Sequence, residues 1–124
     1  MKLLHSIIIG TLLVLFNHPQ SEVPENGTYT YEVAFEEWGG KSLGDEIIVV
    51  LEDGHVALLI SENSNVVWME AKPGDVWEEG TLRKHKSGVW IISNDENDVD
   101  LNEVGGCTGG SIIIDFEKRT IEVC

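Results

Sequence analysis

The sequence predicts an all-β domain, a small antiparallel up-and-down meander barrel that follows an N-terminal signal helix. Three observations favour this fold. Apolar and polar residues alternate in several short segments, Asp-Gly and Pro-Gly pairs separate such segments, and beyond residue 20 no apolar pattern keeps helical spacing for more than a turn. Closing the meander into a barrel removes exposed strand edges; a two-sheet β-sandwich is the alternative.

The N-terminus is typical of an export signal. Met1 and Lys2 precede an apolar run over residues 3–16, and Pro19 follows it. The run is shorter than the roughly twenty residues that span a bilayer. We therefore expect a signal peptide over residues 1–21 and a single domain over residues 22–124, exported to the periplasm or secreted. An uncleaved signal anchor is the alternative, and no other transmembrane span is expected.

About eight short strands are expected in the domain. The first shows the clearest period of two, because its two tyrosines, Val33 and Phe35 fall on one face while Thr28, Thr30 and Glu32 fall on the other. The second and third strands are apolar on both faces, which predicts that they are covered on two sides or line an occupied interior. The expected strands are residues 28–35, 47–51, 56–60, 66–71, 76–82, 89–92, 112–116 and 121–124.

Two turns are indicated by their residue types. Asp53-Gly54 lies between two aliphatic runs and predicts a tight hairpin. Pro73-Gly74 predicts a type II turn, since proline fixes φ near −65° and glycine accepts the positive φ that follows.

Cys107 and Cys124 are the only cysteines, and an even number in an exported chain predicts a disulfide between them. The last hairpin supports this pairing. Residues that oppose each other in an antiparallel pair share a face, so Phe116 should oppose Arg119 or Ile121. Either register places Cys124 on the outer face, where the chain after Cys107 can fold back to meet it.

The charge of the chain excludes some partners. The net charge is −14, from 22 acidic and 8 basic residues, which repels nucleic acid and anionic lipid. A solvated exterior is expected, and a docking surface for a basic partner is the alternative. Residues 98–102 place oxygen ligands at alternate positions, but the glycine and the bidentate glutamate of a calcium loop are missing.

No catalytic or metal-binding constellation is found in the sequence. His55 follows a hairpin turn and His85 stands between two lysines, so both are expected to be exposed. No cluster of zinc ligands and no base paired with a serine or cysteine is present. The sequence therefore predicts neither an enzyme, nor a cofactor, nor a metal site.

Four tryptophans are the candidate ligand-binding residues. Large aromatic side chains often line ligand cavities, although in a small barrel they also serve as core filler. The candidates are Trp38, Trp68, Trp77 and Trp90.

Two resemblances accompany these patterns. Gly27-Thr28-Tyr29 at the start of the first strand is similar to lipocalin-like barrels, which begin with Gly-x-Trp, and this implies a ligand-binding barrel. The segments 37–42, 84–92 and 105–107 resemble small exported bacterial proteins of unknown function, which implies no activity. We expect an exported, non-enzymatic β-barrel that binds a small apolar or amphiphilic ligand. The alternative is a structural or protein-interaction module of the periplasm or cell exterior.

Overall fold

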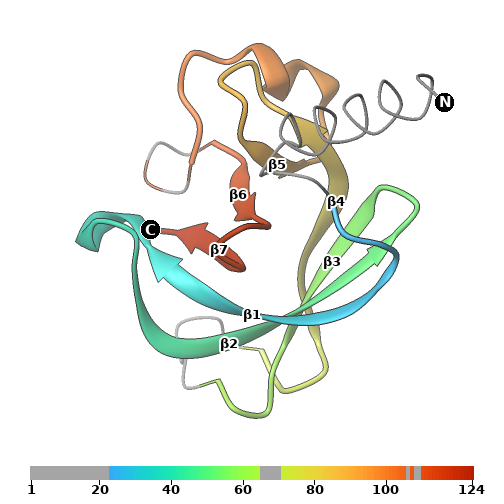
Figure 1. Cartoon of the computed structure of the whole chain (residues 1–124), viewed down its shortest axis with the longest axis vertical. Helices are drawn as coiled ribbons and strands as arrows, with labels where there is room; N and C mark the ends of the chain where they lie inside the picture. The colour runs from blue at the N-terminus through green and yellow to red at the C-terminus, as the bar shows by residue number, and fades with distance from the viewer. Residues whose placement is uncertain (1–22, 65–70, 106, 108–109) are drawn as a thin grey trace, which may run out of the picture.

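Seven strands close into a barrel within the residues that this computed structural model describes, which are 23–64, 71–105, 107 and 110–124. Each strand pairs with the next in chain order around the barrel (Figure 1). The all-β barrel is thereby confirmed in preference to the two-sheet sandwich. The elements are β1 (Gly27–Phe35), η1 (Glu36–Trp38), β2 (Lys41–Glu52), β3 (His55–Ile60), β4 (Val76–Lys84), β5 (Trp90–Ser93), η3 (Glu96–Asp100), β6 (Ile112–Asp115) and β7 (Thr120–Val123).

The pair that closes the barrel is parallel. In a meander each strand reverses the direction of the preceding one, so the first and the seventh strand run the same way. β7 accordingly pairs in parallel with the second half of β1, from Glu32 beside Thr120 to Phe35 beside Val123. The other six pairs are antiparallel.

Two expected elements fall on residues that are not described. The fourth expected strand, residues 66–71, lies outside the described residues except for Ala71, which is not in a strand. The count of about eight strands is therefore not reproduced in the described part of the chain. The expected signal helix over residues 1–21 also lies outside it. No helix among the described residues is long and apolar enough to cross a membrane.

Side chains fill the interior of the barrel. The inner face of β1 carries Tyr31, Val33 and Phe35, which are all buried, while Thr28 and Thr30 on the outer face are exposed. This is the predicted alternation. The buried hydrophobic side chains that are at most 1% exposed come from six of the strands: Val33, Ile47, Val49, Val56, Leu58, Ile91, Ile114 and Ile121.

The outer faces of β2 and β3 are also aliphatic. Ile48 opposes Leu59 and Val50 opposes Ala57 across the ladder, and all four are half-buried. Neighbouring side chains on the pleated surface thus shield one another, as cross-strand pairs do. These strands were expected to be covered on two sides or to line an occupied interior. Their inner faces do line the filled core, whereas their outer faces are only half-buried.

Both predicted turns have the backbone that their residue types favour. Asp53 has φ 50° and Gly54 has φ 84°, as a two-residue hairpin with two positive φ angles requires. Gly74 has φ 88°, and the Asp75 N–H donates to the Lys72 carbonyl at 2.9 Å. The Pro73-Gly74 turn is therefore of type II.

The final hairpin takes the first of the two predicted registers. Asp115 pairs with Thr120 and Ile114 with Ile121, so the ladder continues to Phe116 opposite Arg119.

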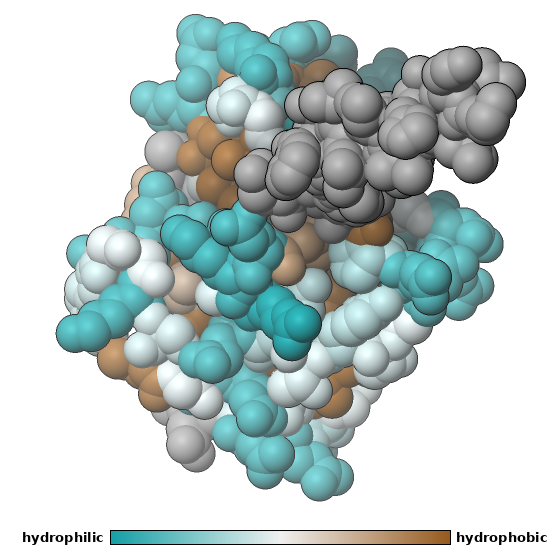
Figure 2. Space-filling view, in the orientation of Figure 1, coloured by the Kyte–Doolittle hydropathy of each residue, from teal (hydrophilic) through white to brown (hydrophobic). Residues whose placement is uncertain are grey.

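The surface is mainly polar. Hydrophilic residues dominate the face seen in Figure 2, and the hydrophobic residues form small separate groups there.

Candidate functional site

The candidate tryptophans that the structure describes lie in different parts of the fold. Trp38 ends η1 and is 55% exposed, whereas Trp77 and Trp90 are half-buried and pack against the core. Trp68 lies outside the described residues. Trp90 lines a cavity to which neither Trp38 nor Trp77 contributes, so the three described tryptophans are not gathered at one site.

Trp90 lines a surface cavity of about 200 Å³ beside β5, β6 and β7. Its ring packs edge-on against Phe116 at a centroid distance of 6.3 Å, and the Lys84 Nζ lies 5.5 Å from the ring centroid. The volume is below the roughly 300–1,000 Å³ of pockets that enclose drug-sized ligands. A small apolar group would fit this cavity, with acidic side chains around it from Asp115, Glu117 and Glu122.

Trp38 belongs to a surface feature that we call the η1 tip, residues 36–43. The indole packs on Phe35 with a centroid distance of 5.5 Å and remains more than half exposed. Two backbone hydrogen bonds hold the turn beneath it: the Gly39 N–H donates to the Glu36 carbonyl at 3.0 Å, and the Gly40 N–H to the Phe35 carbonyl at 2.9 Å. The tip therefore presents an aromatic side chain on a hydrogen-bonded support.

Leu43 is a second exposed apolar residue of the η1 tip, at 56% exposure. It lies in an irregularity of the β1–β2 ladder, because Glu32 pairs with Glu46 whereas Ala34 pairs with Ser42. β2 thus carries extra residues at this point, and a bulge of this kind bends a strand and redirects its side chains.

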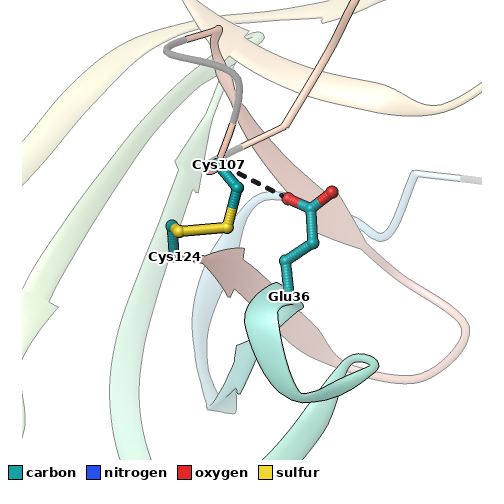
Figure 3. Close-up of a disulfide and its surroundings, with 3 residues drawn as sticks. All are labelled: Glu36, Cys107 and Cys124. Carbon is teal, nitrogen blue, oxygen red and sulfur yellow. Dashed lines mark hydrogen bonds between the residues drawn. A yellow bond between two sulfur atoms is a disulfide. The ribbon is translucent and has the colours of Figure 1, made fainter.

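The disulfide anchors the C-terminus next to the η1 tip. Cys107 and Cys124 are bonded as predicted, with their Cα atoms 4.8 Å apart. The Glu36 carboxylate accepts the Cys107 N–H at 3.3 Å (Figure 3). Gly105, with φ 113°, leaves room for that carboxylate, since a Cβ at this position would lie 2.9 Å from Glu36 Oε2.

Glu122 is the acidic residue of this region whose pKa is shifted from its ordinary value. It lies half-buried on the outer face of β7, between Ile113 of β6 and Ala34 of β1. Burial raises the pKa of its carboxyl group above the usual range, and the negative charge of Glu36 raises it further. No local pattern indicates this pair, since the two residues meet only when β7 joins β1.

His85 is buried, at 3% exposure, which corrects the expectation of an exposed residue. Its Nδ1 accepts the Ser87 N–H at 3.1 Å, and its Nε2 donates to the Leu101 carbonyl at 2.7 Å. The ring therefore ties the β4–β5 turn to the loop after η3. The flanking lysines indicated that His85 would be exposed. The segment at Leu101 that covers its ring lies sixteen residues further along the chain, so the local sequence did not reveal it. His55 is exposed as expected and lies 3.1 Å from Glu79 Oε1.

The carboxylate of Asp98, in the acidic loop after β5, links the two ends of that loop through serine side chains. Asp98 Oδ2 accepts the hydroxyl of Ser93 at 2.6 Å and that of Ser111 at 3.0 Å. Within the described ranges, no three histidine, cysteine, aspartate or glutamate side chains gather as metal ligands would. The hydrogen bonds of Asp98 thus have a structural purpose, which is to join η3 to the start of β6.

The comparisons with known proteins identify no relative: no family model, no curated protein and no solved structure matches the chain.

Proposed function

We propose that this protein is an exported, non-enzymatic interaction module and that the η1 tip contains its main contact residue. The exposure of Trp38 is the observation that carries the proposal. Tryptophan is enriched among the few residues that dominate the free energy of protein–protein binding, and its indole buries a large area at small entropic cost.

The surroundings of Trp38 support the same conclusion. Phe35 packs beneath the indole, and Leu43 adds a second exposed apolar side chain from the same tip. The barrel interior is filled with side chains, so the outer surface is the natural place for contact with a partner. The disulfide is compatible with an oxidising compartment outside the cytoplasm.

The proposal is tested with a photoreactive amino acid placed at the tip. Leu43→p-benzoylphenylalanine, illuminated in cells that make the protein, is expected to give one discrete cross-linked product. The matched control is Val76→p-benzoylphenylalanine, since Val76 is about equally exposed but lies on β4, away from the tip. Trp38→Ala in the Leu43 variant should abolish the product, because it removes the anchor side chain.

Two results would contradict an interaction at the tip. One is equal cross-linking from positions 43 and 76, and the other is a product that persists after Trp38→Ala while the barrel stays folded. The fold of each variant is checked by far-UV circular dichroism, because Trp38 lies outside the core and its removal should leave the strands intact.

Binding of a small apolar group is the second candidate function. It is favoured by the cavity of about 200 Å³ beside Trp90 and Phe116. Saturable binding of an environment-sensitive apolar dye, weakened by Trp90→Ala but unaffected by Trp38→Ala, would favour this candidate over the interaction module.

A further inference from the structure

The seam between β1 and β7 is only half closed. β7 pairs with β1 from Glu32 onward, and the last hydrogen bond toward the N-terminal side runs from the Glu32 N–H to the Arg119 carbonyl at 3.1 Å. Backbone groups of alternate residues in a strand point to the same side, so those of Thr30 and Thr28 also face the seam. β1 pairs there only with β2, and no other described residue hydrogen-bonds to this edge.

A cavity of about 250 Å³ lies along this open edge. Aromatic rings form much of its wall, and a guanidinium group contributes its charge. The lining residues are Pro24, Tyr29, Thr30, Tyr31, Phe116 and Arg119. These residues come from the first strand and the segment just before it, and from the hairpin at the end of the chain, so the closure of the barrel brings them together.

Tyr31 supplies a hydroxyl group to the cavity. The residue is 3% exposed, and its ring packs edge-on against Phe116 at 6.4 Å. Among the described residues, none hydrogen-bonds to the Tyr31 hydroxyl, whereas the hydroxyl of Tyr29 donates to the Glu25 carbonyl. Burial raises the pKa of Tyr31, so the group remains a neutral hydrogen-bond donor. The hydroxyl is accessible from the cavity, since it is not among the fully buried side-chain atoms without a hydrogen-bond partner, and it is free to donate to a group bound there.

Arg119 supplies the positive charge. It has φ 59°, a left-handed conformation in which glycine or asparagine is favoured, and it is exposed in the β6–β7 turn. In the part of the chain that the structure describes, its guanidinium forms no ion pair, although the chain carries a net charge of −14. The nearby Asp115 instead accepts the N–H groups of Glu117 and Lys118.

We propose that this seam binds the C-terminal carboxylate of an extended peptide. The carboxylate accepts hydrogen bonds from the Arg119 guanidinium and the Tyr31 hydroxyl, and the preceding residues add to the free edge at Thr28 and Thr30. A peptide parallel to β1 lies in line with β7 and therefore reaches Arg119 with its C-terminus. Strand addition supplies main-chain hydrogen bonds, and the acidic surface favours a basic peptide.

This peptide site is independent of the η1 tip. The seam borders the first half of β1, whereas the tip follows the second half. A failure at one surface therefore leaves the proposal for the other intact.

The proposal is tested by titrating the disulfide-bonded protein with acetyl-Lys-Val-Lys-Val, followed by NMR. The peptide with a free carboxylate should bind saturably and shift the amide resonances of Thr28 and Thr30. The same peptide with an amidated C-terminus should bind at least about tenfold more weakly, because a hydrogen bond to a charged group is lost.

Comparing Arg119→Gln with Lys118→Gln separates specific binding of the carboxylate by Arg119 from a general effect of positive charge in this turn. Arg119→Gln should weaken binding of the free-acid peptide at least about tenfold, whereas Lys118→Gln should change it less than about twofold. The two changes remove the same charge from adjacent exposed residues, and glutamine is no more strained at φ 59° than arginine. Tyr31→Phe removes only the hydroxyl and should weaken binding of the free acid while leaving that of the amide unchanged.

Several results would overturn the peptide assignment. They are equal affinity for the acid and the amide, equal effects of Arg119→Gln and Lys118→Gln, or no binding at about 1 mM peptide. If N-acetylvaline binds as tightly as the tetrapeptide, the site takes a small free acid and the strand edge contributes nothing. If Arg119→Gln fails to fold, the comparison of acid with amide and the Tyr31→Phe variant still decide the matter.

Discussion

At the scale of single residues, burial and charge act together on Glu122. The carboxyl group faces outward on β7 but is half covered, and Glu36 adds a like charge nearby. Both effects disfavour the carboxylate form, so the folded state binds the Glu122 proton more tightly than the unfolded state does. Stability from this group is therefore fully present below the ordinary glutamate pKa and is lost as the pH rises through the raised pKa.

Glu122→Gln is expected to stabilise the protein at neutral pH, because it removes the partly buried charge and its repulsion from Glu36. The gain should be below about 1 kcal/mol, since the site is partly solvated. It should vanish at acidic pH, where Glu122 is protonated. The measurement is the difference in unfolding free energy between variant and wild type as a function of pH.

Glu37→Gln is the control for this experiment, because Glu37 is an exposed acid of η1. It should leave the pH profile close to that of the wild type. A destabilised Glu122→Gln protein at neutral pH would show that the carboxylate has a favourable partner instead.

At the scale of elements, the hairpin between β2 and β3 shows how a local backbone requirement fixes a register. Six pairs, from Glu52 opposite His55 to Ile47 opposite Ile60, follow from a two-residue turn. A shift of one strand by one residue would move its buried face to the solvent. Asp53 and Gly54 determine the turn, because both adopt positive φ angles.

Gly54→Ala is expected to destabilise the protein by about 1–2 kcal/mol, the usual cost of a left-handed conformation for a residue with a Cβ. No atom lies within 4 Å of the position of such a Cβ, so the cost is conformational and not steric. Gly54→Asn is the matched control and should cost less, since asparagine tolerates positive φ. Urea unfolding of the three proteins measures both values, and equal losses for alanine and asparagine would contradict the argument.

At the scale of the whole molecule, the barrel closes through short strands and a disulfide. β5, β6 and β7 have four residues each, so few ladder hydrogen bonds join β4 back to β1. The bond between Cys107 and Cys124 closes the chain around β6 and β7, and Glu36 connects this loop to the end of β1. The covalent link thus reinforces the part of the barrel with the shortest strands.

Cys124→Ser is expected to lower the free energy of unfolding by roughly 2–4 kcal/mol, because the unfolded chain regains the freedom that the closed loop removes. Equilibrium unfolding in urea measures the change. The Cys107→Ser/Cys124→Ser double variant is the control for effects of the free thiol and should show a similar loss. A loss below about 1 kcal/mol in both variants would mean that the disulfide adds little to the fold.

Much of the fold could be predicted from the sequence, because the signals concerned are local. Tyr31, Val33 and Phe35 share a face through the period of two, and Asp53-Gly54 and Pro73-Gly74 set their turns through their own φ angles. The disulfide followed from the number of cysteines and the register of the last hairpin. Each of these inferences needs only residues that lie close together in the chain or the chemistry of one residue type.

The tertiary structure alone decided which distant residues meet. The parallel closure of β1 by β7 depends on the number of strands in the barrel, and the burial of His85 depends on a loop that returns from η3. Residues of mixed polarity flank the tryptophans, so the sequence could not show that Trp38 and Trp90 lie in different parts of the structure. Tyr31 and Arg119 line one cavity because the first strand meets the last, and that contact arises from packing of the whole chain, which no local pattern encodes.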